Sequence, residues 1–278
     1  MDFLEALHAR VVPGDGAMGT LLFSRGVPRD ACLEELCVSS PEKVGEIHRE
    51  YLAAGAQVIR THSFGSNAVR LVRHGLERRV GELNWLAARI AREATKGTNA
   101  FVAASIGPTG QGANARAFLE EQMGALLDGG AQMVILETFT DLTELLVAVE
   151  VKHTLHHCPV VASVSCDNRA GVTQAFEQLR NASADVVGVN CTGDPASTLE
   201  LLPVDLGDIL VSGFPNAGMP IDNGEVLTFP IGPEAFAAGA GELLARGVRF
   251  LGGCCGTTPE HIAALVARVC PREPTSTR

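Results

Sequence analysis

The sequence has few aromatic residues, little positive charge and none of the long apolar runs of membrane proteins. No apolar run reaches about 18 residues, the length that a membrane-spanning helix requires. The formal net charge of −10 disfavours a surface that follows the phosphates of a nucleic acid. With one tryptophan and one tyrosine, the chain has few residues for an aromatic cage around a quaternary ammonium ligand. We therefore expect a globular protein whose partners include neither nucleic acid nor a membrane.

The first residues, MDFLEALHARVVPGDG, are acidic and amphipathic. A secretory signal peptide instead begins with basic residues that precede an apolar core. We therefore expect a cytoplasmic location. In that compartment the eight cysteines should be reduced, so their spacing decides whether any of them bind a metal.

Short segments rich in Val and Ile recur along the chain, each followed by small or polar residues and then by a helical pattern. These segments are 11–15, 57–64, 101–107, 133–139, 160–166, 186–191, 209–218 and 248–255. Near-continuous apolar strands that alternate with helices indicate a parallel sheet covered on its outer face. Eight such units predict an α/β fold, a single-domain (β/α)8 TIM barrel. We expect the barrel to occupy residues 1–270, with 271–278 a disordered tail or the start of a linker.

Several helices carry recognisable start signals. Asp141 followed by Glu144 is close to a capping box. The pairs Asp194-Pro195 and Thr258-Pro259 each follow a cysteine by a few residues, and proline is favoured at the first helical position. We therefore expect two helices to begin next to cysteines, at the C-terminal ends of the sixth and eighth strands.

Polar residues and cysteines gather where the predicted strands end, which is the end of a barrel that holds active sites. Those expected there are Asp15, His62, Glu137, Cys191, Asn216, Cys254 and Cys255. Within a strand, Cys254 and Cys255 would point to opposite faces. Glycines at 252, 253 and 256 allow the backbone to turn instead. Because only one strand separates the sixth from the eighth, we expect a single metal to contact all three thiols.

Three cysteine ligands with a fourth position open form the catalytic arrangement of zinc rather than the structural one. Three thiolates more than cancel the charge of the ion, which makes it a poor activator of water. The ion would still deprotonate an incoming thiol, which is otherwise only a few per cent ionised at neutral pH. The predicted chemistry is therefore the alkylation of a thiol substrate.

Four motifs resemble one known family: GDGAMGT (14–20), ILETFTD (135–141), GVNCTGDP (188–195) and GGCCGTTPEHI (252–262). They are similar to the homocysteine-binding domain of zinc-dependent homocysteine S-methyltransferases. This group includes the N-terminal module of cobalamin-dependent methionine synthase and the betaine–homocysteine enzymes. The resemblance covers nearly the whole chain and implies a barrel fold, Zn²⁺ on Cys191, Cys254 and Cys255, and methionine as the product.

The same resemblance implies roles for the substrate-binding residues. Asp15 and the backbone of Ala17 and Met18 would hold the amino acid end of homocysteine, and Glu137 would take its ammonium group. Asn216 would lie beside the metal and fill its open position in the absence of substrate. One departure from the family pattern is His62, where related sequences carry Asn, and its role is open between substrate contact and packing.

The methyl donor divides the functional hypotheses. One is a stand-alone enzyme that uses S-methylmethionine or betaine, although the scarcity of aromatic residues disfavours betaine. Another is a module or subunit that receives its methyl group from a corrinoid protein. A hypothesis from a different class is a non-enzymatic zinc barrel whose vicinal thiols sense redox state.

Overall fold

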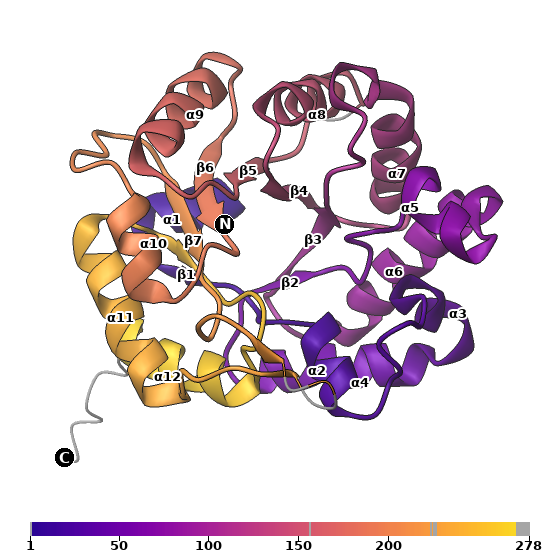
Figure 1. Ribbon diagram of the computed structural model, residues 1–278, viewed down its shortest axis with the longest axis horizontal. Helices are drawn as coiled ribbons and strands as arrows, with labels where there is room; N and C mark the ends of the chain where they lie inside the picture. Colours follow the sequence, from indigo (N-terminus) through magenta and orange to yellow (C-terminus); the bar gives the residue numbers. More distant parts are fainter. Residues whose placement is uncertain (1, 156, 223, 225–226, 271–278) are drawn as a thin grey trace.

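The computed structural model describes residues 2–155, 157–222, 224 and 227–270. Eight parallel strands form a nearly closed barrel inside a ring of helices (Figure 1). The strands are β1 (Val12–Pro13), β2 (Val58–Arg60), β3 (Phe101–Ile106), β4 (Met133–Phe139), β5 (Val160–Val164), β6 (Val186–Asn190), β7 (Val211–Phe214) and β10 (Phe250–Leu251). The predicted α/β barrel is confirmed, and each predicted segment contains one of these strands. The predicted tail, 271–278, lies outside the described residues.

The strand order explains how distant parts of the chain meet. Neighbouring strands follow the order β1-β10-β7-β6-β5-β4-β3-β2. A parallel bridge between Gly14 and Val58 joins the two outermost strands, which brings β1 next to β2 as well as β10. The first, second and last strands therefore lie side by side, and the residues that follow them share one end of the barrel.

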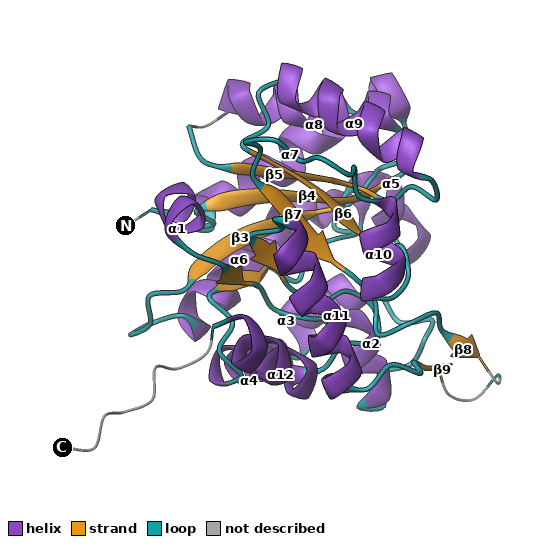
Figure 2. Ribbon diagram, turned by 90° about the vertical axis from the view of Figure 1, so that its left-hand side faces the viewer, coloured by secondary structure: helices purple, strands orange, loops and turns teal. Residues whose placement is uncertain are grey.

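Helices cover the outside of the barrel and one of its ends. They are α1 (Phe3–Ala9), α2 (Gly19–Ser24), α3 (Leu36–Ser39), α4 (Pro41–Ala53), α5 (Ala68–Leu71), α6 (Val80–Ala94), α7 (Arg116–Asp128), α8 (Leu142–Leu155), α9 (Arg169–Asn181), α10 (Pro195–Leu201), α11 (Pro233–Arg246) and α12 (Pro259–Val269). Figure 2 shows α1 at one end of the strands and a small antiparallel hairpin, β8 (Ile221–Asp222) with β9 (Leu227–Thr228), near the other. Among these helices of the described chain, none has the length and apolar character to cross a membrane.

The strands are buried on both faces, which is why their sequences read as continuous apolar runs. Their outward side chains pack against the helices, while inward ones such as Met133 and Ile135 form a second cluster with Phe3 of α1. Since side chains alternate along a strand, the inward series of β4 continues from Ile135 to Glu137. By the same alternation, Arg60 follows the inward Val58 of β2. Charged residues thus stand on the apolar interior at its C-terminal end.

Two predicted helix starts are present as expected. Asp194 caps α10 by accepting a hydrogen bond from the backbone N–H of Ser197. Thr258 caps α12 through a reciprocal capping box with His261. Both caps lie a few residues beyond a cysteine, so they fix the direction in which the chain leaves the cysteine-bearing turns.

The prediction of a capping box at the start of α8 was wrong. Asp141 accepts a hydrogen bond from the Thr143 N–H, but Glu144 does not turn back onto the helix. Its buried carboxylate accepts bonds from the backbone N–H groups of Thr109 and Gly110 and from the Thr109 hydroxyl. The β3–α7 loop offers this carboxylate three donors, more than its own helix end does.

Candidate active site

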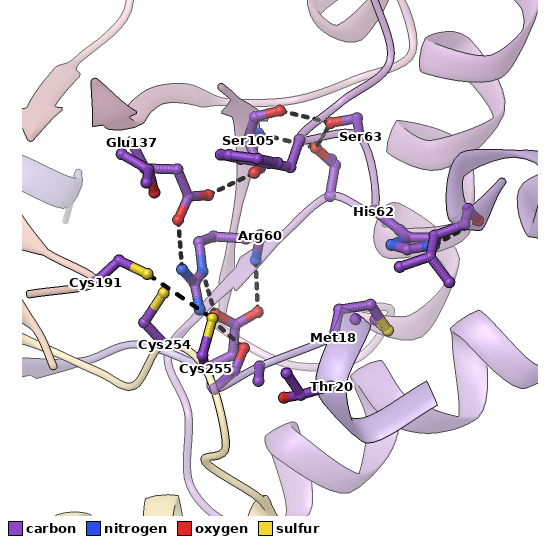
Figure 3. Close-up of a pocket in the computed structure, with 18 of the residues that line it drawn as sticks. Met18, Thr20, Arg60, His62, Ser63, Ser105, Glu137, Cys191, Cys254 and Cys255 are labelled. Atoms are coloured by element: carbon purple, nitrogen blue, oxygen red, sulfur yellow. Dashed lines mark hydrogen bonds and ion pairs between the residues drawn. The ribbon is translucent and has the colours of Figure 1, made fainter. Parts of the chain in front are cut away.

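Three cysteine sulfurs meet at the C-terminal end of the barrel (Figure 3). Cys191 directly follows β6, and Cys254 and Cys255 follow β10. The three Sγ atoms lie within 4.8 Å of one another, and those of Cys191 and Cys255 are 3.8 Å apart. Two sulfurs bound tetrahedrally at about 2.3 Å from a zinc ion would be about 3.8 Å apart. The donor set and its spacing therefore fit a zinc-sized cation.

The backbone bends sharply at both cysteine-bearing segments. Cys191 has φ 59°, a left-handed conformation that is uncommon for residues other than glycine. Gly256, with φ 79°, completes the turn that the sequence predicted after β10. Gly253 serves a different purpose, because a Cβ on it would lie 2.4 Å from the Thr257 hydroxyl oxygen. The turn therefore depends on close packing as well as on backbone freedom.

Main-chain hydrogen bonds hold the turn after β10 against the segment after β7. The Cys254 N–H donates to the Pro215 carbonyl at 2.7 Å. The Cys255 N–H donates to the Asn216 side-chain oxygen at 3.0 Å. The predicted neighbour of the metal, Asn216, thus binds the backbone of a cysteine and orients it. In this structure the Asn216 side-chain oxygen accepts a bond from the Cys255 backbone. Its predicted role at an open metal position stays a prediction.

Hydrogen bonds among the three thiols shift their pKa values in opposite directions. Hydrogen bonds from Cys254 and Cys255 lower the pKa of Cys191. The bonds to Cys191, with burial and the nearby charge, raise the pKa of Cys254 and of Cys255. A divalent cation bound to the three sulfurs would allow all of them to ionise.

A buried charge cluster lies beside the sulfurs, with Arg60 at its centre. The Arg60 Nε and Nη1 atoms bind Asp15 and Glu137, each at 2.7 Å. The Arg60 backbone N–H donates to the second Asp15 oxygen at 2.8 Å, and the Ser105 hydroxyl donates to the second Glu137 oxygen. In Figure 3 the Arg60 side chain lies between Glu137 and the cysteines. Every carboxylate oxygen of the cluster thus has a donor from the chain itself.

Burial and charge act in opposite directions within this cluster. Burial raises the pKa of Asp15, and the Arg60 guanidinium partly offsets this effect. Burial also disfavours a charged guanidinium, but Glu137 and Asp15 raise the pKa of Arg60. The guanidinium also contacts the face of the Phe214 ring at 4.8 Å. Arg60 is therefore a fixed cation in the wall of the site.

Sequence reasoning did not identify Arg60. The resemblance implied that Glu137 would bind the substrate ammonium, whereas in the structure Glu137 pairs with Arg60 of β2. The signal was present, because Arg60 lies two residues after Val58 and therefore faces the same interior as Glu137. The ion pair could have been predicted by matching Arg60, the one charged residue of its apolar strand, with Glu137, the one charged residue of another.

The backbone predicted to hold the amino acid end of the substrate is partly engaged within the protein. The Ala17 N–H donates to the Thr257 hydroxyl at 3.0 Å. The Ala17 carbonyl accepts a 2.6 Å bond from the Tyr51 hydroxyl. These bonds tie the segment after β1 to the turn after β10 and to α4. Ala17 and Met18 both line the cavity described next.

A cavity of about 360 Å³ opens over these groups. Its wall includes the three cysteines, Asp15, Glu137 and Arg60. His62 also lines it, with the ring Nε2 2.7 Å from the Leu33 carbonyl oxygen, and burial lowers the pKa of that ring. The volume is suited to a small molecule that contacts both the sulfurs and the carboxylates.

A second feature that sequence reasoning missed is the support beneath Glu137. The next residue, Thr138, has φ 63°. Asn190 holds it in place, since the Asn190 Oδ1 accepts from the Thr138 N–H at 2.8 Å and its Nδ2 donates to the Thr138 hydroxyl at 2.7 Å. Asn190 immediately precedes Cys191, so its side chain links β4, the strand that carries Glu137, to the segment that carries a cysteine.

Comparisons with known proteins agree on one family. The sequence model described as "Homocysteine S-methyltransferase" matches residues 13–269. Methionine synthases of Mycobacterium leprae and Mycobacterium tuberculosis are each 32% identical over 302 aligned positions, which cover 96% of this chain. The same alignments cover 25% of those proteins, so the chain spans about a quarter of the length of the curated relatives it matches.

Solved structures show the same fold. The metallated form of the homocysteine methyltransferase MmuM from Escherichia coli aligns with a TM-score of 0.76 at 26% identity, over 93% of this chain and 96% of that one. The oxidised form aligns with a TM-score of 0.80 at 24% identity, over 96% of this chain and 100% of that one. The barrel described above therefore aligns with the whole chain of the oxidised form.

Proposed function

Because this chain belongs to the homocysteine S-methyltransferase family, we propose that it transfers a methyl group to the sulfur of homocysteine and forms methionine. The observation that carries the proposal is the convergence of Cys191, Cys254 and Cys255 within 4.8 Å at the edge of a cavity that also holds Asp15 and Glu137. A thiol and an ammonium group of one small molecule then find partners in the same cavity.

We propose zinc as the metal and the three cysteines as its ligands. The 3.8 Å separation of the Cys191 and Cys255 sulfurs supports this assignment, as does the all-sulfur donor set. A zinc ion bound there would keep the substrate sulfur deprotonated at neutral pH. Asn216 and Pro215 fix the backbone of the two later cysteines. The expected cytoplasmic location agrees with a site that requires reduced thiols.

Side chains of the protein bind and orient the substrate. Glu137, 6% exposed, accepts the substrate ammonium, and Asp15 adds a second negative charge close by. Asn190 and Thr138 hold the Glu137 backbone in its orientation. In the reaction, the substrate sulfur uses a lone pair to form a bond to the methyl carbon. The bond between that carbon and the donor breaks, and its electrons leave with the donor.

The two alternatives for the donor draw on different comparisons. The match to 96% of the metallated MmuM chain supports a stand-alone enzyme, for which we propose a small donor such as S-methylmethionine. The match to a quarter of each methionine synthase supports a module or subunit that receives its methyl group from a corrinoid protein. Betaine has the least support, because Tyr51 is fully buried and binds the Ala17 carbonyl, which leaves it unsuited to a quaternary ammonium cage.

One assay separates these possibilities. The purified chain is loaded with zinc, supplied with homocysteine, and offered S-methylmethionine, betaine or methylcobalamin in turn while methionine is measured. Methionine from S-methylmethionine assigns a stand-alone enzyme, and methionine from methylcobalamin alone assigns a corrinoid-dependent one. No homocysteine binding, together with zinc release on mild oxidation, would reject the methyltransferase proposal in favour of the redox-sensing barrel.

A further inference from the structure

Arg60 occupies a position that a ligand cation would be expected to take. Its guanidinium bridges Asp15 and Glu137, the two carboxylates to which the proposed function assigns the substrate ammonium. Two further N–H groups, on Nη2, donate to the carbonyls of Gly16 and Gly253 at 2.8 and 2.7 Å. Four of the five guanidinium N–H groups are thus engaged by the chain.

This arrangement changes what the carboxylates need from a ligand. Two buried carboxylates without a cation would be strongly destabilised, and a ligand ammonium would then be essential to both. Here Arg60 cancels one of the two negative charges and donates to both groups. One unbalanced charge remains at this end of the cavity, so an ammonium is still attracted but is no longer required.

We propose that Arg60 is a specificity-determining residue that widens the substrate class of this site to thiols without an ammonium group. The proposal rests on the assignment of a thiol substrate to the three cysteines. The residue supplies internally the cation that homocysteine would otherwise provide. A mercaptocarboxylate of the same length is therefore bound alongside homocysteine.

The experiment compares two thiols that differ in a single group. Homocysteine and 4-mercaptobutanoate share the thiol, the carboxylate and the chain length, and only homocysteine carries the ammonium. Calorimetry with zinc-loaded protein gives a dissociation constant for each. In the wild-type protein we expect the two constants to differ by about tenfold or less. In Arg60→Met we expect the ratio to rise by about a further tenfold, because the ammonium becomes the sole cation for two carboxylates.

Two variants control for charge and for general damage. Arg60→Lys keeps a cation and should keep a ratio near the wild-type value. Arg70→Met removes another partly buried arginine, which donates to the Pro108 carbonyl and contacts the Phe64 ring. It should leave the ratio unchanged. Because both thiols are measured on one preparation, a loss of folded protein lowers the number of sites without moving the ratio.

The outcomes distinguish this inference from the proposed function. An unchanged ratio in Arg60→Met overturns the inference. A wild-type ratio above about 100-fold overturns it as well, and this measurement decides the question even if Arg60→Met does not fold. Wild-type protein that binds neither zinc nor either thiol rejects the proposed function and the inference together.

Discussion

The sulfurs of Cys191 and Cys255 face each other at 3.8 Å although the two residues are 64 positions apart in the chain. The strands that precede them, β6 and β10, are both neighbours of β7 in the barrel. The left-handed backbone of Cys191 and the turn at Gly256 then direct both side chains to the same point. A site of this kind is defined by how the strands end more than by the strands themselves.

Replacement of Cys255 by Ala should abolish both zinc retention and methionine formation. Two sulfurs remain, and a zinc ion with two protein thiolates loses the donor set on which the proposed chemistry depends. Metal content by mass spectrometry and methionine release measure the two effects. Cys166→Ala is the control, since Cys166 follows β5 and its sulfur contacts Asn168. A Cys255→Ala protein with full activity would reject the proposed site.

Replacement of Glu137 by Gln should raise the KM for homocysteine about tenfold while zinc binding stays unchanged. The variant removes the charge that attracts the ammonium, and a hydrogen bond to a charged group contributes about 1.5–3 kcal/mol. The matched control is Glu144→Gln, which alters another buried glutamate that binds the 109–110 backbone. That control should lower thermal stability and leave KM as it is. Equal KM values for wild type and Glu137→Gln would contradict the assigned role.

Replacement of Gly256 by Ala should weaken zinc binding by at least about tenfold, or 1.4 kcal/mol. The residue has φ 79°, which disfavours any side chain, and a Cβ would lie 2.1 Å from the Phe229 ring. Competition with a chromogenic chelator measures the affinity. Gly207→Ala shares the left-handed backbone but has open space around it, so it should leave zinc binding intact. Equal zinc affinity in Gly256→Ala would show that the turn tolerates displacement.

The buried His48 should make the fold sensitive to mild acid. Burial, with repulsion from His62 and Arg49, lowers the pKa of His48 from 6.5 to about 3. Between these values the unfolded chain binds a proton that the folded chain excludes, so stability falls as the pH decreases. From pH 7 to pH 5 this linkage removes about 2 kcal/mol of the free energy of unfolding.

Chemical denaturation at the two pH values measures this linkage. His48→Leu should lose that part of the pH dependence, whereas a change at the exposed His8 should preserve it. Identical pH dependence in wild type and His48→Leu would mean that the ring becomes protonated within the folded protein.

The sequence was sufficient to predict the fold because the strands are apolar on both faces and start signals mark the helices between them. It was also sufficient to bring the cysteines together, since glycines flank Cys254 and Cys255 and strand order places them near Cys191. Alternation along β4 likewise brings Glu137 to the interior. These features depend on local pattern and on the regular geometry of a barrel.

The features that the sequence did not predict are side-chain pairings between elements. Glu144 follows a helix-cap pattern, yet it binds the β3–α7 loop because that loop offers it more donors. Arg60 appears as one charge in an apolar strand, and its partners lie on β4 and in the segment after β1. Asn190 supports Thr138 across 52 residues. Such pairs depend on which rotamers meet in space, and one sequence carries no direct record of that.

The segments that bear Asp15, Arg60, Glu137, Cys191 and Cys255 are drawn from almost the whole length of the polypeptide. During synthesis the carboxylates and the guanidinium emerge long before the last two sulfurs. A nascent chain therefore has no complete cysteine cluster until β10 has been made and has docked between β1 and β7. On the proposed assignment of the cation to the three cysteines, a barrel truncated before β10 stays metal-free, and metal occupancy reports whether β10 has docked.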